Sequence, residues 1–117
     1  MIDILKKYQE IITSYDIHCL DYELLSYRIK TDIILIDDSK LIVKDYLFIN
    51  NVRKYSYHWQ NKYNQLIIRW DNAPHWKLIE TFPYHKHNFD EKNIEPSKEV
   101  SLEDVLEYIK KELILLI

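Results

Sequence analysis

The 117-residue sequence contains no glycine, although glycine makes up roughly 7% of an average protein. A phosphate-binding P-loop and a Rossmann dinucleotide turn both need glycine where the backbone approaches phosphate, so the sequence excludes both. Tight turns must instead use Asn and Asp, which tolerate a positive φ better than other residues with a side chain. We therefore expect turns at residues 37–39, 50–51, 61–64 and 71–72.

The composition is that of a folded domain, with 47% hydrophobic and 30% charged residues. The length predicts a single domain over residues 1–117. Cys19 is the only cysteine, which excludes an intramolecular disulfide and suits a reducing compartment. The first residues lead into polar sequence, and no apolar run approaches the roughly 18 residues of a membrane span. We therefore expect a cytoplasmic protein without a membrane partner.

Hydrophobic periodicity predicts an α+β fold in which an antiparallel meander of four or five strands lies between two helices. The first helix is expected at residues 3–15, and the last at residues 102–115, where Ser101 and Asp104 form a capping box. Period-two alternation predicts strands at residues 24–32, 41–49, 53–60, 66–71 and 78–84, followed by a polar stretch at 85–97. The helices should cover one sheet face and leave the other open.

The hairpin formed by residues 53–71 carries the most informative local pattern. A four-residue loop at 61–64 would pair His58 with Ile67 and Ser56 with Arg69. A register slip of two residues would leave every side chain on the same face. One face of the hairpin is then aromatic and aliphatic, and the other gathers Lys54, Ser56, His58, Arg69 and Asp71.

Charge is distributed unevenly along the chain, whose net charge is −3. Residues 53–87 carry six Lys or Arg and two acidic side chains, whereas the segments on either side are both acidic. The same segment holds four of the five histidines and all three tryptophans. Any surface that binds a polyanion is therefore expected to be built from this segment.

Cleavage of RNA without a metal needs a base, an acid and a cation that stabilises the phosphorane, and the middle segment offers all three. The candidate catalytic residues are His58, Arg69, Asp71, His75, His85 and His87, with no cofactor. Cations and aromatic rings that could hold RNA are Lys54, Lys62, Lys86, Trp76 and Tyr84. The leading interpretation is a metal-independent ribonuclease.

Two other interpretations remain open. His85 and His87 point the same way on an extended strand, so that His75 or Asp71 could complete a metal site for a hydrolase or nuclease. Alternatively, the chain is a binding module that inhibits a cellular target without catalysis.

Four segments resemble the TumE family: RKYSYHWQ at 53–60, RWDNAPH at 69–75, TFPYHKH at 81–87 and SLEDVL at 101–106. The resemblance covers residues 22–110 and implies a toxin of a type II toxin–antitoxin module, partnered by a helix-turn-helix antitoxin. RelE-like toxins, small α/β domains that cut mRNA, supply the analogy for a two-layer fold and for a ribonuclease acting on mRNA or tRNA. Trp76 is a departure, because the resemblance leads us to expect a second histidine after His75.

The end of the chain is apolar around the whole helix circumference, from Leu113 to Ile117. One apolar stripe can pack on the sheet, but Leu115, Leu116 and Ile117 extend beyond it. Burying each would stabilise the protein by about 1.5–3 kcal/mol, which favours a second surface. We expect these residues to contact the antitoxin or a second subunit in a homodimer.

Overall fold

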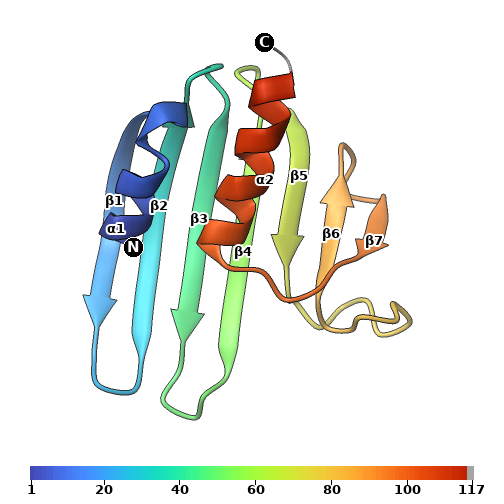
Figure 1. Cartoon of the computed structure of the whole chain (residues 1–117). Coiled ribbons are helices and arrows are strands. Elements are labelled where there is room, and N and C mark those ends of the chain that lie inside the picture. Colours follow the sequence, from blue (N-terminus) through green and yellow to red (C-terminus); the bar gives the residue numbers. More distant parts are fainter. Residues whose placement is uncertain (116–117) are drawn as a thin grey trace.

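A computed structural model describes residues 1–115. Within this range the elements are α1 (Ile2–Lys7), a 3-10 turn η1 (Gln9–Ile11), β1 (Ile12–Tyr22), β2 (Tyr27–Leu35), β3 (Lys40–Leu47), β4 (Arg53–Gln60), β5 (Leu66–Asp71), β6 (His85–Asn88), β7 (Ile94–Pro96) and α2 (Leu102–Leu115) (Figure 1). None of the described helices is long and apolar enough to cross a membrane.

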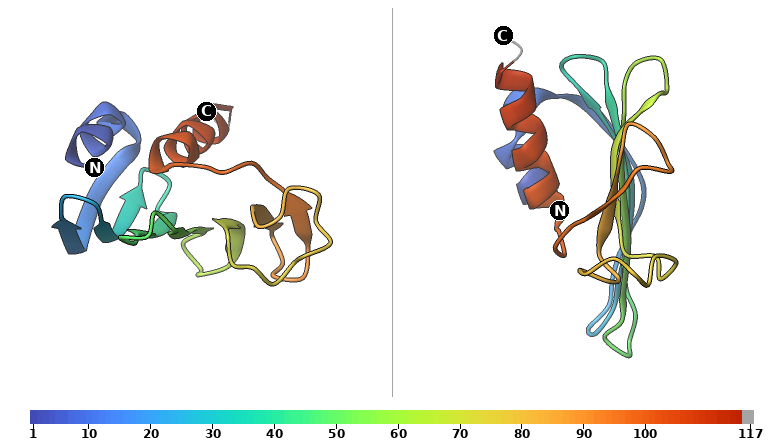
Figure 2. Two further views of the ribbon diagram at one scale, coloured as in Figure 1. Left: turned by 90° about the horizontal axis from the view of Figure 1, so that it is seen from below. Right: turned by 90° about the vertical axis from the view of Figure 1, so that its right-hand side faces the viewer.

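The strands form one open antiparallel sheet in which each strand pairs with the next along the chain. Both helices lie on the same side of this sheet (Figure 2). The predicted α+β architecture is therefore confirmed, with a meander of seven strands, rather than four or five, among residues 1–115.

The core lies between the sheet and the two helical segments that cover it, with α2 over the central strands. Ser101 caps α2 as predicted, because its hydroxyl accepts from the Asp104 amide while Asp104 accepts from the Ser101 amide. Leu106 and Ile109 are fully buried against the sheet. Trp70 meets the edge of the Tyr108 ring at 5.5 Å between centroids. The apolar stripe of α2 therefore determines which face of the sheet is covered and closed to solvent.

The predicted helix at 3–15 is wrong in its second half, because α1 ends at Lys7 and β1 begins at Ile12. Leu5, Tyr8 and Ile11 are buried, so the chain packs its first apolar side chains over α1, η1 and the residue between them. From Ile12 onward the backbone instead pairs with β2 over most of that strand. This long-range pairing outweighs the local helical pattern.

The predicted strand at 78–84 is also wrong. Residues 72–84 form a series of turns in which Leu78 is fully exposed, and β6 and β7 follow within the stretch expected to be irregular. Pro83 lacks the backbone N–H that a ladder needs. The sequence of β6 shows no apolar alternation, because the side chains that it buries are histidines, and β7 has only three residues.

The hairpin of β4 and β5 confirms the predicted faces with a register shifted by two residues. His58 lies directly opposite Arg69, and Ser56 opposite Asp71. The turns are made without glycine as expected, since Asp38, Asn51 and Asn64 adopt φ values of 66°, 66° and 63°. At residues 71–72, by contrast, no positive φ occurs, and Asn72 instead accepts from the Tyr55 amide and donates to the Arg53 carbonyl.

At the C-terminal end, Leu113 is buried, whereas Ile114 and Leu115 are exposed on α2. Leu116 and Ile117, which also entered the predicted contact with a partner, lie outside the described residues.

Candidate functional site

The sheet face opposite the helices, here called the open face, carries most of the predicted site. The strand register aligns its side chains in two rows across β4, β5 and β6: His58, Arg69 and His87 in one row, and Ser56, Asp71 and His85 in the next. Cross-strand neighbours of this kind lie close enough to interact. Residues far apart in the sequence are thereby brought side by side.

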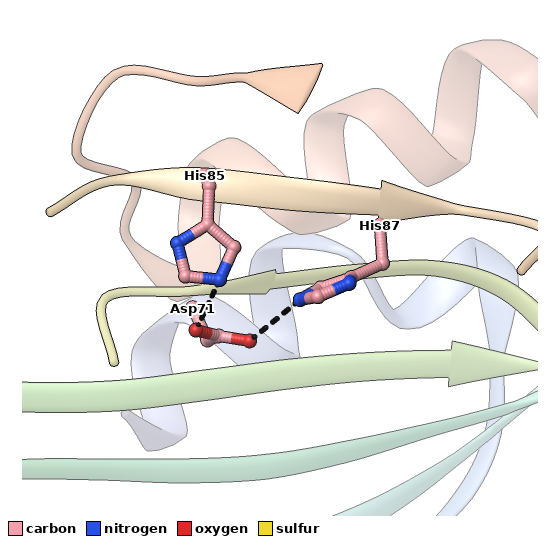
Figure 3. A group of neighbouring side chains, drawn as sticks. All are labelled: Asp71, His85 and His87. Carbon is pink, nitrogen blue, oxygen red and sulfur yellow. Dashed lines mark ion pairs between the residues drawn. The ribbon is translucent and has the colours of Figure 1, made fainter. Parts of the chain in front are cut away.

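Asp71, His85 and His87 form a compact buried cluster (Figure 3). Their side chains come from β5 and β6, and the three residues are 6%, 1% and 2% exposed. One carboxylate oxygen of Asp71 lies 2.8 Å from Nε2 of His85, and the other lies 3.4 Å from Nε2 of His87. Both imidazoles therefore converge on a single carboxylate.

The opposite nitrogen of each ring contacts a backbone carbonyl oxygen. Nδ1 of His85 lies 3.0 Å from the Pro83 oxygen, and Nδ1 of His87 lies 2.8 Å from the Glu91 oxygen. A carbonyl oxygen only accepts hydrogen bonds, so both Nδ1 atoms carry a proton. These contacts fix the tautomer and the orientation of both rings.

Arg69 is held by two carboxylates. Its Nε donates to Asp71 at 3.1 Å, and its terminal nitrogens pair with Glu91 at 2.6 and 2.5 Å. The Ala73 amide also donates to Asp71, at 3.0 Å. With its donors engaged in this way, Arg69 positions Asp71 and neutralises Glu91, and it offers no free fork to a phosphate.

His58 lies beside this cluster in a different environment. It is half-buried and lines a cleft of about 430 Å³ together with Lys44, Lys54 and Ser56. Burial lowers the pKa of His58 from its ordinary value, and the Arg69 guanidinium lowers it further. The imidazole is therefore neutral at pH 7 and able to accept a proton.

A second cleft of about 580 Å³ adjoins the first, because Arg69, Asp71 and Ala73 line both. The other walls of this cleft include His75 and Trp76 from the 72–84 segment. The Trp76 ring forms T-shaped contacts with the His85 and His87 rings, at 6.5 and 6.4 Å between centroids. The tryptophan that replaces an expected histidine thus covers the cluster.

The six predicted catalytic residues therefore lie around two adjoining clefts, but they do not form one open surface. Asp71, His85 and His87 are buried, while His58 is half-buried and His75 is exposed. Of the predicted RNA-binding residues, Lys54 and Trp76 line these clefts.

Three predicted RNA-binding residues lie elsewhere. Lys62 is exposed in the loop between β4 and β5, near the ring of Tyr63. Lys86 alternates with the two histidines of β6, so its side chain lies on the helix side, where it lines a hollow with residues of α2. Tyr84 packs against the core.

Two lysines of the open face were missed in the sequence. Lys44 lines the His58 cleft from β3, and Lys30 lies directly opposite it on β2. Both are exposed, and neither forms an ion pair with any residue in the range 1–115. Alternation within the predicted strand 41–49 was the available signal, since Lys44 alternates with the buried Val43 and Asp45.

A family model described as "Toxin TumE" matches residues 1–113 of the chain. The match includes both clefts and the whole Asp71–His85–His87 cluster. No curated protein and no solved structure matches the sequence.

Proposed function

The chain belongs to the TumE toxin family, and from this premise we propose that it arrests growth by cleaving RNA on the open face of its sheet. The observation that carries the proposal is the position of His58. This neutral imidazole lies in a cleft with free lysines, directly opposite Arg69 and next to the buried histidine cluster. The proposed substrate is RNA, either mRNA or tRNA.

Charge supports a polyanionic ligand at this position. Lys30, Lys44 and Lys54 are exposed on three consecutive strands of the open face, without an ion pair in the part of the chain that the structure describes. Exposed lysines on one face suit a ligand whose backbone carries one negative charge per nucleotide. Phosphate contacts of this kind hold the strand without reading its sequence.

The reaction proposed is an attack of the RNA 2′-oxygen on the adjacent phosphorus. His58 takes the proton of the 2′-hydroxyl, the bond between the 2′-oxygen and phosphorus forms, and the bond to the 5′-oxygen breaks. His75, exposed at the rim of the second cleft, donates the proton that the departing 5′-oxygen takes up. The products are a 2′,3′-cyclic phosphate and a free 5′-hydroxyl, and Lys44 and Lys54 stabilise the charge of the phosphorane.

In a toxin–antitoxin module the antitoxin binds and inhibits the toxin, and we propose a helix-turn-helix antitoxin as the partner of this chain. Ile114 and Leu115 are exposed at the end of α2, on the helix side of the sheet. A partner that covers them would leave the open face free for RNA. Alternatively, a second copy of the chain covers this surface, and the two copies form a homodimer through the end of α2.

The test is incubation of the purified protein with RNA, followed by analysis of the new ends. We expect cleavage that leaves 2′,3′-cyclic phosphates and is lost in His58→Ala. His18→Ala is the matched control, because His18 lies on β1 and lines neither cleft. RNA that is bound but stays intact would overturn the proposal and favour a non-catalytic binding module.

A further inference from the structure

The histidine cluster poses a problem of charge that its own residues do not solve. A neutral imidazole carries one proton, and in His85 and His87 that proton is on Nδ1, where it meets a backbone carbonyl. Each Nε2 atom then presents a lone pair, and each faces an oxygen of the Asp71 carboxylate. A lone pair and a negative oxygen repel each other unless a cation lies between them.

Both Nε2 atoms are buried, and neither has a hydrogen-bond partner of acceptable geometry among residues 1–115. Buried polar atoms in native proteins nearly always have a partner, and an orphan needs an explanation. Here two orphans point at the same carboxylate from neighbouring positions of one strand. The arrangement therefore calls for something that accepts electron pairs from both rings at once.

Protons are the alternative to a metal ion, since two protonated rings carry the same total charge as a divalent ion held by two neutral rings. The distances favour the ion. A protonated ring that donates to a carboxylate lies about 2.7–2.9 Å from it, whereas Nε2 of His87 lies 3.4 Å from Asp71. Neither Nε2 atom forms a hydrogen bond of acceptable geometry among residues 1–115.

We propose that Asp71, His85 and His87 bind one divalent transition-metal ion of the zinc class. Their ligand atoms all lie within 4.8 Å of one another, and ligands about 2.0–2.2 Å from a tetrahedral ion lie roughly 3.3 Å apart. Two imidazole nitrogens and one carboxylate oxygen suit zinc, manganese or iron and disfavour calcium and magnesium, which prefer oxygen ligands.

The surroundings of the cluster are those of a metal site. Histidine ligands commonly donate their other ring N–H to a backbone carbonyl, as His85 does to Pro83 and His87 to Glu91. Asp71 is oriented by two donors, the Arg69 side chain and the Ala73 amide. Each of the three ligands is therefore held in place by a further contact before the ion arrives.

The role of this ion rests on the proposed function. The three ligands line the cleft that contains His75, and a site with three protein ligands keeps a position for water or substrate. In that position the ion would polarise a phosphate oxygen of the RNA bound beside His58. This assignment departs from the metal-independent reaction expected from the sequence.

The test is direct metal analysis of protein purified without a histidine tag. After dialysis against micromolar zinc, we expect about one zinc per chain by elemental analysis, and at least a tenfold loss of affinity in His85→Ala and His87→Ala. His18→Ala, the control outside the cluster, should bind like the wild type. Wild-type protein that retains no zinc, manganese or iron would overturn the proposal.

A second measurement guards against variants that fail to fold. In the wild type, chelator should lower the Tm and zinc should restore it, because a ligand that binds only the folded state stabilises it. Nitrogen-15 spectra of the wild type with zinc should show metal-bound Nε2 atoms, and protonated Nε2 atoms in both rings would overturn the proposal. RNA cleavage by protein that binds no metal would overturn the metal site alone, whereas metal binding without cleavage would overturn only the proposed function.

Discussion

Each face of the sheet buries one aspartate, and the two differ in how completely their charges are matched. On the helix side, Asp45 accepts from the hydroxyls of Tyr27 and Tyr57 at 3.0 and 2.6 Å and from two nitrogens of Arg53 at 3.0 and 2.9 Å. On the open face, Asp71 accepts from Arg69 and Ala73 and faces two bare imidazole nitrogens.

The comparison assigns the Asp45 network to the stability of the fold and the Asp71 cluster to function. Burial and the Asp45 carboxylate raise the pKa of Tyr57. Its hydroxyl therefore stays protonated and donates a hydrogen bond to Asp45. That network is complete and has nothing left to bind. A buried polar network with every member paired rigidifies a core, whereas one with unpaired members is suited to a ligand.

The largest effect should follow from breaking the complete network. Asp45→Asn leaves Arg53 half-buried with only Glu99 as a charged partner, and we expect a loss of about 3 kcal/mol in the free energy of unfolding. Urea denaturation followed by tryptophan fluorescence measures it. A loss below about 1 kcal/mol would mean that the network contributes little to the fold.

The two faces should also differ in RNA binding. Replacing Lys44 and Lys54 together by Ala should weaken RNA binding roughly tenfold and lower the slope of affinity against salt by about two. Lys86→Ala is the control, because that lysine lies on the helix side. Filter binding at several salt concentrations gives both quantities, and equal losses from the two faces would contradict the assignment of the RNA surface.

The matched substitution on the open face, Asp71→Asn, should cost less than Asp45→Asn. In protein treated with chelator, the new NH2 group faces either the Arg69 side chain or the Ala73 amide and loses that hydrogen bond, but it can donate to a bare imidazole nitrogen instead. We therefore expect a loss of about 1 kcal/mol in the free energy of unfolding. Urea denaturation in the presence of chelator measures this change. A loss as large as that of Asp45→Asn would place Asp71 among the purely structural groups.

The smallest effect on stability is expected at the C-terminal end. Deletion of residues 114–117 removes Ile114 and Leu115, which are 55% and 80% exposed, and should change the free energy of unfolding by less than about 0.5 kcal/mol. Binding to the antitoxin, or the dimer mass measured by light scattering, should fall instead. If both binding and mass stayed unchanged, this end of α2 would not be an interface.

Sequence patterns were sufficient to predict those parts of the fold in which the contacts are local. The capping box at Ser101, the stripe of α2 and the two faces of the hairpin around His58 all follow from spacing along the chain. The strand β1 could not be predicted in this way, because Leu5, Tyr8 and Ile12 also match a helical stripe. Its pairing with β2 depends on tertiary structure.

The site was predicted in its residue types more than in its geometry. Asp71, His85 and His87 were recognised as candidates, but their meeting depends on β6 pairing with β5 after a segment of turns. The contacts of the two Nδ1 atoms with Pro83 and Glu91 have no signature in the sequence. These contacts decide whether the histidines can exchange protons, so the protonation of the two rings cannot be predicted from the sequence alone.

Growth of cells after induction tests the central claim most directly, with Asp71→Asn and Tyr57→Phe compared with the wild type at equal soluble levels. We predict that cells expressing D71N grow like uninduced cells, because the cluster on the open face has lost the carboxylate that completes its metal site. Cells expressing Y57F should arrest like the wild type, because a single hydroxyl of the complete network contributes about 1.5–3 kcal/mol to folding and nothing to the reaction. Arrest by D71N as strong as that by the wild type would contradict a functional role of the Asp71–His85–His87 cluster.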